Sequence, residues 1–210
     1  MDRKHIVIFG QSGMIGNLVT QKLIQDASFN ITSIQRKQDP LLPSYIQQYT
    51  IDCIQQICLK ADHVVICIGA RLEKREPISN LKKVDLLLVN KIAKWAQTMH
   101  IPHISIISSI GADRFSTSYY LKMKGQMERS IRKLSFDSIT FYKPALFSPS
   151  QRVKKRWREW LPYPFLFICK YIPLMQNYQP VCPIAFSNRI ISNLKQVQRG
   201  IIEIKGNELT

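Results

Sequence analysis

A glycine-rich turn directly after a short apolar run is the feature that most constrains how this chain folds. Residues Ile6 to Phe9 are β-branched or aromatic and predict a buried strand. Gly10, Gly13 and Gly16 follow at a spacing of three, and a segment with helical periodicity begins among them. A strand that enters a helix through such a turn is typical of a parallel α/β sheet that binds a dinucleotide. The alternative is a turn with a purely structural role.

Alternation of strand-like and helix-like segments continues to about residue 145. The expected strands are 6–9, 31–34, 46–51, 63–68, 104–107 and 138–142, and the expected helices are 15–25, 53–59, 82–99 and 119–134. This rhythm predicts crossover connections and a parallel sheet. Apolar runs such as Val64 to Ile68 require burial on both faces of the sheet. The sequence therefore predicts an α/β fold, a three-layer Rossmann-type sandwich with a mostly parallel sheet.

After Pro144 the pattern changes, because prolines become frequent and basic and aromatic residues cluster at 152–160. We expect a short cap over the carboxyl edge of the sheet, where open α/β folds bind their ligands. The expected organisation is a single domain over 1–210, with a dinucleotide-binding core at 1–147 and a small substrate cap and C-terminal elements at 148–210.

Composition restricts the class of protein. The 210 residues are 45% hydrophobic, which is enough for one packed core, and no apolar stretch approaches the length of a spanning helix. The start of the chain lacks the apolar core of a signal peptide, so we expect a cytoplasmic protein. The five scattered cysteines indicate neither a disulfide framework nor a zinc site, and the pair His100 and His103 lacks further ligands, so we expect no metal.

The net charge is strongly positive. Thirty lysines and arginines stand against fourteen acidic residues, which gives +16. Such a charge attracts polyanions, phosphorylated cofactors or anionic lipid surfaces. No specific nucleic-acid partner is expected, because no known nucleic-acid-binding motif accompanies the charge.

Each glycine of the first turn has a physical task if a dinucleotide binds there. Gly10 permits the tight turn, Gly13 lets backbone amides approach a pyrophosphate, and Gly16 permits close packing of helix on strand. The N-terminus of the following helix supplies free N–H groups and a partial positive charge to the phosphates.

Basic residues end the second expected strand. An NAD-selective site usually carries an acidic residue at this point, whereas this chain has Arg36 and Lys37. A guanidinium and an ammonium suit a 2′-phosphate, so NADP(H) is expected, with NAD(H) as second choice. Two solvated loop cations are the alternative.

Further along, Asp52 is placed to accept a hydrogen bond from an adenine amino group, or else to cap a helix from Cys53 onward. Gly69 and Ala70 would give a ribose an uncluttered backbone, although a plain turn also explains the glycine. The complete set of expected cofactor-binding residues is Gly10, Ser12, Gly13, Met14, Ile15, Gly16, Arg36, Lys37, Asp52, Gly69, Ala70 and Lys124.

A serine pair and a tyrosine–lysine pair suggest proton chemistry. Ser108 and Ser109 close the fifth expected strand, and Tyr120 and Lys124 share one face of a helix at i, i+4. An ammonium near a phenol favours the phenolate and brings proton transfer closer to neutral pH. A serine hydroxyl can steady the oxygen on which charge changes. A solvated helix face is the alternative for the tyrosine and lysine.

These motifs resemble the short-chain dehydrogenase/reductase superfamily: Gly10 to Gly16, Ser108 to Asp113, Tyr120 to Gly125, and Lys143-Pro144 after the sixth strand. More narrowly, the chain is similar to its atypical branch, which is related to Tat-interacting protein and to nucleoside-diphosphate-sugar epimerase-like proteins. The resemblance implies a bound nicotinamide dinucleotide, Tyr120 as proton donor or acceptor, and Lys124 on the nicotinamide ribose. It also implies a serine that orients the substrate, with Ser109 at the usual position and Ser108 as its support.

The chain also departs from this pattern. The branch more often has Arg-Pro-Gly after the sixth strand, where this chain has Lys143-Pro144-Ala145, and the C-terminal part is short for a sugar-nucleotide epimerase. Asn90 resembles the asparagine common on the preceding helix, although a helix-surface amide is an equal alternative.

Three function hypotheses follow. The first is an NADP(H)-dependent oxidoreductase that transfers a hydride between nicotinamide and a small carbonyl or quinone substrate, with Ser109, Tyr120 and Lys124 as catalytic residues. The second is a non-catalytic NADP(H)-binding regulatory or assembly protein. The third is a polyanion- or membrane-surface-binding protein, for which segment 152–167 offers cations and aromatics. That segment is alternatively a substrate lid, and the protein is expected as a monomer or homodimer.

Overall fold

The structure, a computed structural model, describes residues 3–69, 82–148 and 179–209. The strands are β1 (Lys4–Phe9), β2 (Phe29–Gln35), β3 (Gln47–Thr50), β4 (His63–Ile66), β5 (His103–Ile107), β6 (Ser138–Lys143) and β7 (Gly200–Lys205). The α-helices are α1 (Met14–Gln25), α3 (Val89–Thr98), α4 (Tyr119–Ile131) and α6 (Pro183–Lys195). The shorter helical elements are η1 (Ile51–Gln56), η2 (Lys82–Leu88) and η6 (Gly206–Leu209).

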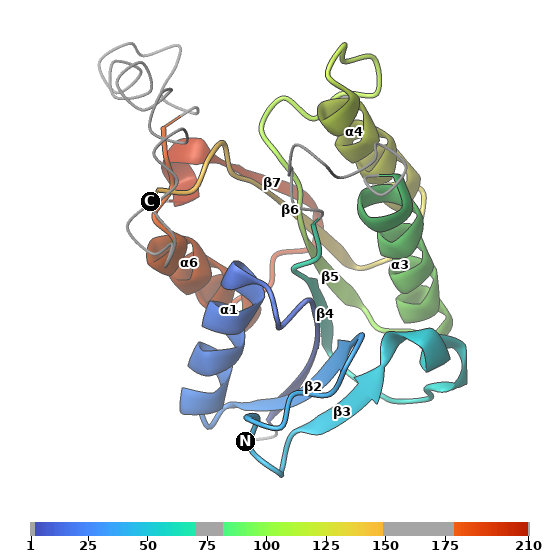
Figure 1. Ribbon diagram of the computed structural model, residues 1–210, viewed down its shortest axis with the longest axis vertical. Coiled ribbons are helices and arrows are strands. Elements are labelled where there is room, and N and C mark those ends of the chain that lie inside the picture. The colour runs from blue at the N-terminus through green and yellow to red at the C-terminus, as the bar shows by residue number, and fades with distance from the viewer. Residues whose placement is uncertain (1–2, 70–81, 149–178, 210) are drawn as a thin grey trace.

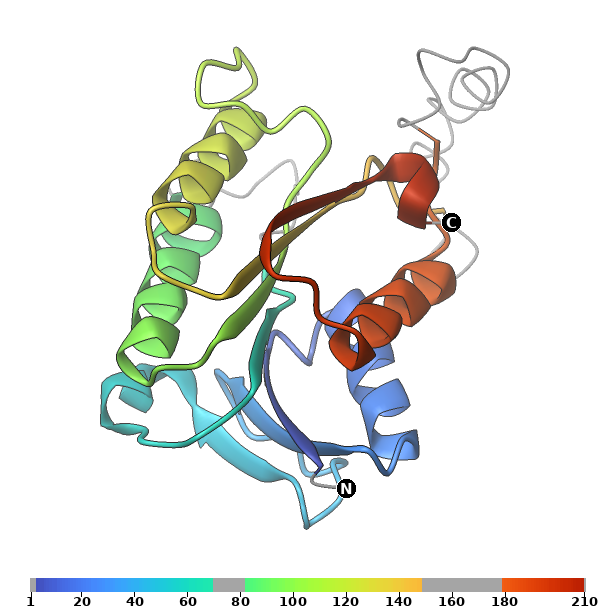
Figure 2. The ribbon, with the colours of Figure 1, turned by 180° about the vertical axis from the view of Figure 1, so that it is seen from behind.

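The seven strands form one parallel sheet in the order β3-β2-β1-β4-β5-β6-β7. Helices α1 and α6 cover one face and helices α3 and α4 cover the other, as Figures 1 and 2 show from opposite sides. The Rossmann-type three-layer sandwich predicted from the sequence is therefore confirmed. The order reverses between β1 and β4, and in open α/β sheets the crevice at such a reversal is where ligands bind.

Alternating side chains of β1 divide the core between the two faces. Val7 and Phe9 pack with the α3 and α4 side, while Ile6 and Ile8 pack with the α1 and α6 side. All four side chains are fully buried. This two-sided burial explains why the strand is a continuous apolar run rather than an alternating one.

The C-terminal part differs from the expectation of a cap. Within the described residues, α6 packs beside α1 and β7 pairs with β6 along its whole length, so both belong to the sandwich. Pro183 stands at the start of α6, where its missing N–H costs no helical hydrogen bond. Residues 149–178, including the basic and aromatic segment 152–167, lie outside the described residues.

The residues just before residue 149 contact residues shortly after residue 178. Phe147 forms a parallel bridge with Val181. The Val181 amide donates to Leu146 O at 2.7 Å, and the Ser148 amide donates to Val181 O at 2.9 Å. These contacts fix both ends of the intervening residues against the same edge of the sandwich.

Two of the expected helices are not α-helical over their whole length. The segment expected as a helix at 53–59 is the 3₁₀ helix η1, which begins at Ile51. The helix expected at 82–99 is π-helical over η2 and α-helical over α3. Leu88 is the last residue of η2 and the N-cap of α3. Its φ of −67° and ψ of −44° are helical, so the π-helix continues directly into the α-helix. Among the described helices, none is long and apolar enough to span a bilayer.

Candidate functional site

The first turn is built so tightly that glycine is required at two of its positions. Gly10 has φ +84°, and a Cβ on it would lie 2.8 Å from the Cys67 carbonyl that follows β4. A Cβ on Gly16 would lie 2.0 Å from the Gly10 carbonyl oxygen. Gly13 closes the turn by donating its amide to Gly10 O at 3.0 Å. The turn therefore keeps its backbone uncovered at the carboxyl end of β1.

The N-terminus of α1 fits an anion. Met14, Ile15 and Gly16 form its first turn, where amides have no partner within the helix. The N-cap Gly13 offers no side-chain acceptor, and the first turn carries no acidic residue. The side chain of Ser12 is exposed at the mouth of the turn. These groups suit the pyrophosphate of a dinucleotide, which the sequence led us to expect here.

At the end of β2, Arg36 and Lys37 are exposed. Neither has an ion pair or a side-chain hydrogen bond within residues 3–69, 82–148 and 179–209. The loop that follows is tied to the glycine turn, because Gln11 Nε2 donates to Asp39 Oδ2 at 3.0 Å. Two cations without partners thus stand beside the turn that would hold the phosphates.

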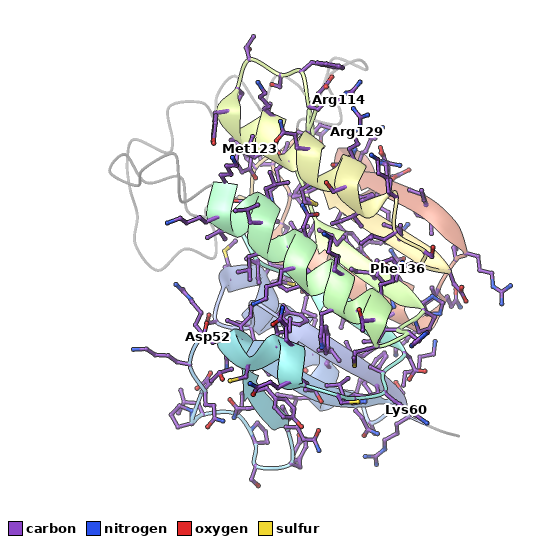
Figure 3. All side chains as sticks on the ribbon, turned by 90° about the vertical axis from the view of Figure 1, so that its right-hand side faces the viewer. Asp52, Lys60, Arg114, Met123, Arg129 and Phe136 are labelled. Carbon is purple, nitrogen blue, oxygen red and sulfur yellow. The ribbon has the colours of Figure 1, made fainter. Side chains whose placement is uncertain are left out.

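The residues expected around adenosine are less clearly placed. Asp52 is an exposed residue in the first turn of η1, whose N-cap is Thr50, so the alternative reading of Asp52 as an N-cap is wrong. Figure 3 shows Asp52 well apart from α4. Gly69 is exposed, and a Cβ on it would lie 3.8 Å from Asp85 Oδ1, an ordinary contact. Ala70 lies outside the described residues.

The two serines after β5 have different surroundings. Ser108 is buried and donates its hydroxyl to Glu128 Oε1 at 2.5 Å. Ser109 is 7% exposed, and its hydroxyl makes only a long contact of 3.3 Å to the neighbouring Ile110 carbonyl. Because Glu128 engages Ser108, Ser109 is the serine whose hydroxyl remains available to a further partner.

Glu128 belongs to a cluster of charges behind Ser108. Lys143 Nζ lies 2.8 Å from Glu128 Oε2 and 3.0 Å from Glu203 Oε1 on β7, and Arg132 pairs with the same two glutamates. Burial raises the pKa of Glu203, but the hydrogen bond and charge of Lys143 outweigh it, so the pKa lies below its ordinary value. Lys143 thus compensates the buried carboxylate that holds Ser108.

Lys124 is a buried charge of the site. Its side chain is 2% exposed, its ammonium lies 2.7 Å from Asp85 Oδ1, and it donates to the Ile107 carbonyl at the end of β5 at 3.1 Å. The ammonium lies 6.0 Å from the ring centroid of Tyr120, which is half-buried one turn earlier on α4. Asp85 comes from the π-helical stretch η2 and is fully buried.

These contacts join segments that are far apart in the sequence. The glycine turn packs on the residues that follow β4, and the same residues approach Asp85 at Gly69. Asp85 holds Lys124, which reaches the end of β5 just before the two serines. The glycine turn, Ser109 and Lys124 therefore gather at one edge of the sheet. This edge is made by the carboxyl ends of β1, β4 and β5, the strands around the reversal of strand order.

Sequence reasoning missed two residues. Asp85 and Glu128 were not expected to contribute; their signals are a single carboxylate in the apolar run Val84 to Val89, and a glutamate one turn after Lys124. Asn90 lines an outer groove between α3 and α4, which fits its alternative interpretation as a helix-surface amide. In the part of the chain that is described, no three His, Cys, Asp or Glu residues lie close enough to hold a metal ion.

This chain has relatives among known proteins. No family model matches the chain. The chain is 25% identical to Protein HTATIP2 of Rattus norvegicus over 174 residues, covering 79% of this chain and 71% of that protein. It is 24% identical to Protein FMP52, mitochondrial, of Candida albicans over 147 residues, covering 65% of this chain and 64% of that protein.

Solved structures share the fold. The UDP-glucuronic acid 4-epimerase of Bacillus cereus, solved in complex with NAD, superposes with a TM-score of 0.66. The alignment covers 97% of this chain and 78% of that chain at 12% identity. The resemblance predicted from the motifs is therefore confirmed by the sequence relatives, and the epimerase shows that the fold is shared.

Proposed function

We propose that this chain belongs to the atypical branch of the short-chain dehydrogenase/reductase superfamily and is an NADP(H)-dependent oxidoreductase acting on a small carbonyl or quinone substrate. The observation that carries the proposal is the meeting of three segments at one sheet edge. The glycine turn after β1, the serines after β5 and Lys124 on α4 are linked there through Asp85 and the residues after β4. The proposed dinucleotide site would therefore lie at the same edge of the sheet as Lys124 and the serines after β5.

Each residue has a role that follows from its surroundings. The bound nicotinamide would supply or accept the hydride. The Tyr120 hydroxyl would give or take the proton at the substrate oxygen, and the Lys124 ammonium lies near its ring. The Ser109 hydroxyl would donate a hydrogen bond to that oxygen as its charge grows. Ser108, held by Glu128, would fix the backbone on which Ser109 stands.

Removing the Tyr120 hydroxyl tests the proposal. We expect Tyr120→Phe to lower kcat by about 100-fold or more in a panel of carbonyls and quinones with NADPH, because general acid catalysis contributes on this scale. The Kd for NADPH should stay within about twofold, since the glycine turn is untouched. Tyr119→Phe removes the neighbouring hydroxyl and should retain the wild-type rate. Full activity of Tyr120→Phe, or no turnover by the wild type, would contradict an enzymatic role.

We propose that the two exposed cations after β2, Arg36 and Lys37, determine the preference for NADPH over NADH. We expect Arg36→Ala with Lys37→Ala to raise the Kd for NADPH by at least about tenfold and to leave the Kd for NADH nearly unchanged, since charge-assisted contacts to the 2′-phosphate are lost. Isothermal titration calorimetry measures both constants. Gln38→Ala, in the same exposed loop, serves as the control. An equal loss for both dinucleotides would contradict the 2′-phosphate assignment.

A second function is favoured by one observation. Asp85 lies closer to the Lys124 ammonium than Tyr120 does, so it offsets part of the charge that would stabilise a phenolate. We propose as the alternative a non-catalytic NADP(H)-binding regulatory or assembly protein. Tight binding of NADPH with no turnover, even in a single-turnover experiment across the substrate panel, distinguishes it from the enzyme.

Other assignments from the sequence stay predictions. Cytoplasmic location is one of them; the word mitochondrial in the name of FMP52 describes that protein. Contact of segment 152–167 with anionic membranes, a small-molecule substrate, and a monomeric or homodimeric state are the others. The division into a dinucleotide-binding core at 1–147 and a substrate cap with C-terminal elements at 148–210 is also a prediction, and α6 and β7 of the second part belong to the sandwich.

A further inference from the structure

An open groove runs along the outer side of α4, away from the proposed active site. Its volume is about 620 Å³, and it is lined by side chains from η2, the start of α3, α4 and the loop before α4. Lys124, Met123 and Met127 lie on the inner face of α4, whereas Lys122, Gln126 and Arg129 face the groove. Figure 3 shows Arg114 and Arg129 on this outer side, near the same end of the molecule.

Cations dominate the groove. Arg114, Lys122, Arg129 and Lys133 all line it and all are exposed, and no carboxylate is among the described lining residues. The three on and just beyond α4 follow intervals of seven and four residues, which place them on one stripe of the helix. Like charges gathered in one groove repel one another unless an anion compensates them.

The protein does not supply that anion within its described parts. None of the four cations forms an ion pair there, although Arg114 stacks on Phe115 at 4.2 Å from the ring centroid. By contrast, Arg132, the neighbour of Lys133, turns inward and pairs with Glu203. No carboxylate of the described residues therefore competes with an external anion for the groove cations.

Apolar and neutral polar groups lie between the cations. Leu87 is 53% exposed and Phe115 is 75% exposed, so both offer apolar surface to a ligand in the groove. Asn90, Gln126 and Ser130 are half-buried and offer both hydrogen-bond donors and acceptors. The groove thus offers places for acidic side chains, an apolar side chain and a peptide backbone.

We propose that this groove binds an acidic segment of a partner protein, with an apolar residue of that segment packed against Leu87 and Phe115. A second copy of this chain fits poorly, because a two-fold contact would bring the same four cations against one another. A nucleic acid is disfavoured because phosphates, which supply most of its contacts, have no use for exposed apolar side chains on the groove wall. This inference stands whether or not the protein is an enzyme.

The probe is a fluorescein-labelled synthetic peptide in which glutamates flank one leucine and one phenylalanine. By fluorescence anisotropy, we expect saturable binding that weakens by about tenfold between low and physiological salt, because exposed charges are screened. Arg129→Glu with Lys133→Glu should weaken binding by at least about tenfold. Phe115→Ser should weaken it by about threefold or more without changing any charge.

Matched controls separate the groove from the overall charge. Arg189→Glu with Arg199→Glu makes the same change of net charge at exposed positions on and beyond α6, on the other face of the sheet, and should leave peptide affinity within about twofold. The same peptide with glutamine in place of glutamate should not bind. All variants should melt within a few degrees of the wild type, since the changed side chains are exposed.

Three results would overturn the proposal. One is equal loss of peptide affinity in the groove variant and the α6 variant, which would mean attraction to net charge alone. Another is tighter binding of oligo-dT or phosphatidylserine vesicles than of the peptide, lost in the groove variant. The third is a dimer by light scattering that Arg129→Glu with Lys133→Glu dissociates, which would make the groove an interface between copies.

Discussion

Replacing Lys124 with methionine is expected to lower the free energy of unfolding by about 3 to 5 kcal/mol, because it leaves the Asp85 carboxylate buried without its cation. Both side chains are at most 2% exposed, so solvent cannot compensate the lost charge. Urea unfolding followed by the fluorescence of the buried Trp95 measures the effect. Dinucleotide binding should be lost as well, since Lys124 is the residue proposed to hold the nicotinamide ribose.

A second substitution separates the two roles of Lys124. Lys124→Met combined with Asp85→Leu removes both charges, and we expect it to recover most of the lost stability, because an apolar pair of similar volume can replace a buried ion pair. Dinucleotide binding should not return in the double variant.

Lys143→Met is the matched control for burial of an ion pair. Its partners Glu128 and Glu203 lie behind Ser108, so this variant should lose stability yet retain the Kd for NADPH. Recovery of dinucleotide binding in the Lys124→Met, Asp85→Leu protein would refute the role given to Lys124. An unchanged free energy of unfolding in Lys124→Met would contradict the stabilising role of the ion pair between Lys124 and Asp85.

Adding one methyl group at Gly16 is expected to abolish dinucleotide binding. The new Cβ would lie 2.0 Å from the Gly10 carbonyl oxygen, far inside van der Waals contact. A Cβ is fixed to its Cα and the oxygen belongs to the backbone, so neither atom can rotate away. Helix α1 must then shift from the end of β1, which carries its free amides away from the phosphates. We expect a Kd for NADPH raised by more than about 100-fold and a stability loss of about 1 to 3 kcal/mol, typical of overpacking. Calorimetry and thermal melting give the two values.

Gly69→Ala is the control for the fold in this experiment. It makes the same chemical change in the segment after β4, where the nearest atom to a new Cβ is Asp85 Oδ1 at 3.8 Å. We expect it to melt within about two degrees of the wild type, as for a substitution without strain. Normal NADPH affinity in Gly16→Ala would show that the dinucleotide binds elsewhere.

The sheet was predictable where each strand carries its own signal. Ile6 to Phe9 and Val64 to Val65 are apolar on both faces, so their strands could be predicted without knowledge of their neighbours. The strand β7 could not, because Ile201 and Glu203 lie at the sheet edge and are only partly covered. Helix α6 was hidden by Pro183, which reads as a helix breaker in a sequence and is a helix start in the structure.

The site residues could be predicted where their spacing along the sequence is enough to bring them together. The glycine turn and the Tyr120 and Lys124 pair depend on residues a few positions apart, and local geometry fixes these spacings. The inward position of Asp85 could not be predicted, because η2 is π-helical and its wider turn changes which residue faces inward. Glu128 resembled a surface charge, since its partners Ser108 and Lys143 are distant in sequence and reach it only through the tertiary fold.

The bridge between Phe147 and Val181 has an evolutionary consequence. Backbone hydrogen bonds there join two points of the chain that are far apart in the sequence, so a change in the number of residues between them need not alter the pairing of β6 with β7. A lineage could therefore vary the sequence between these two points and still inherit the seven-stranded sheet.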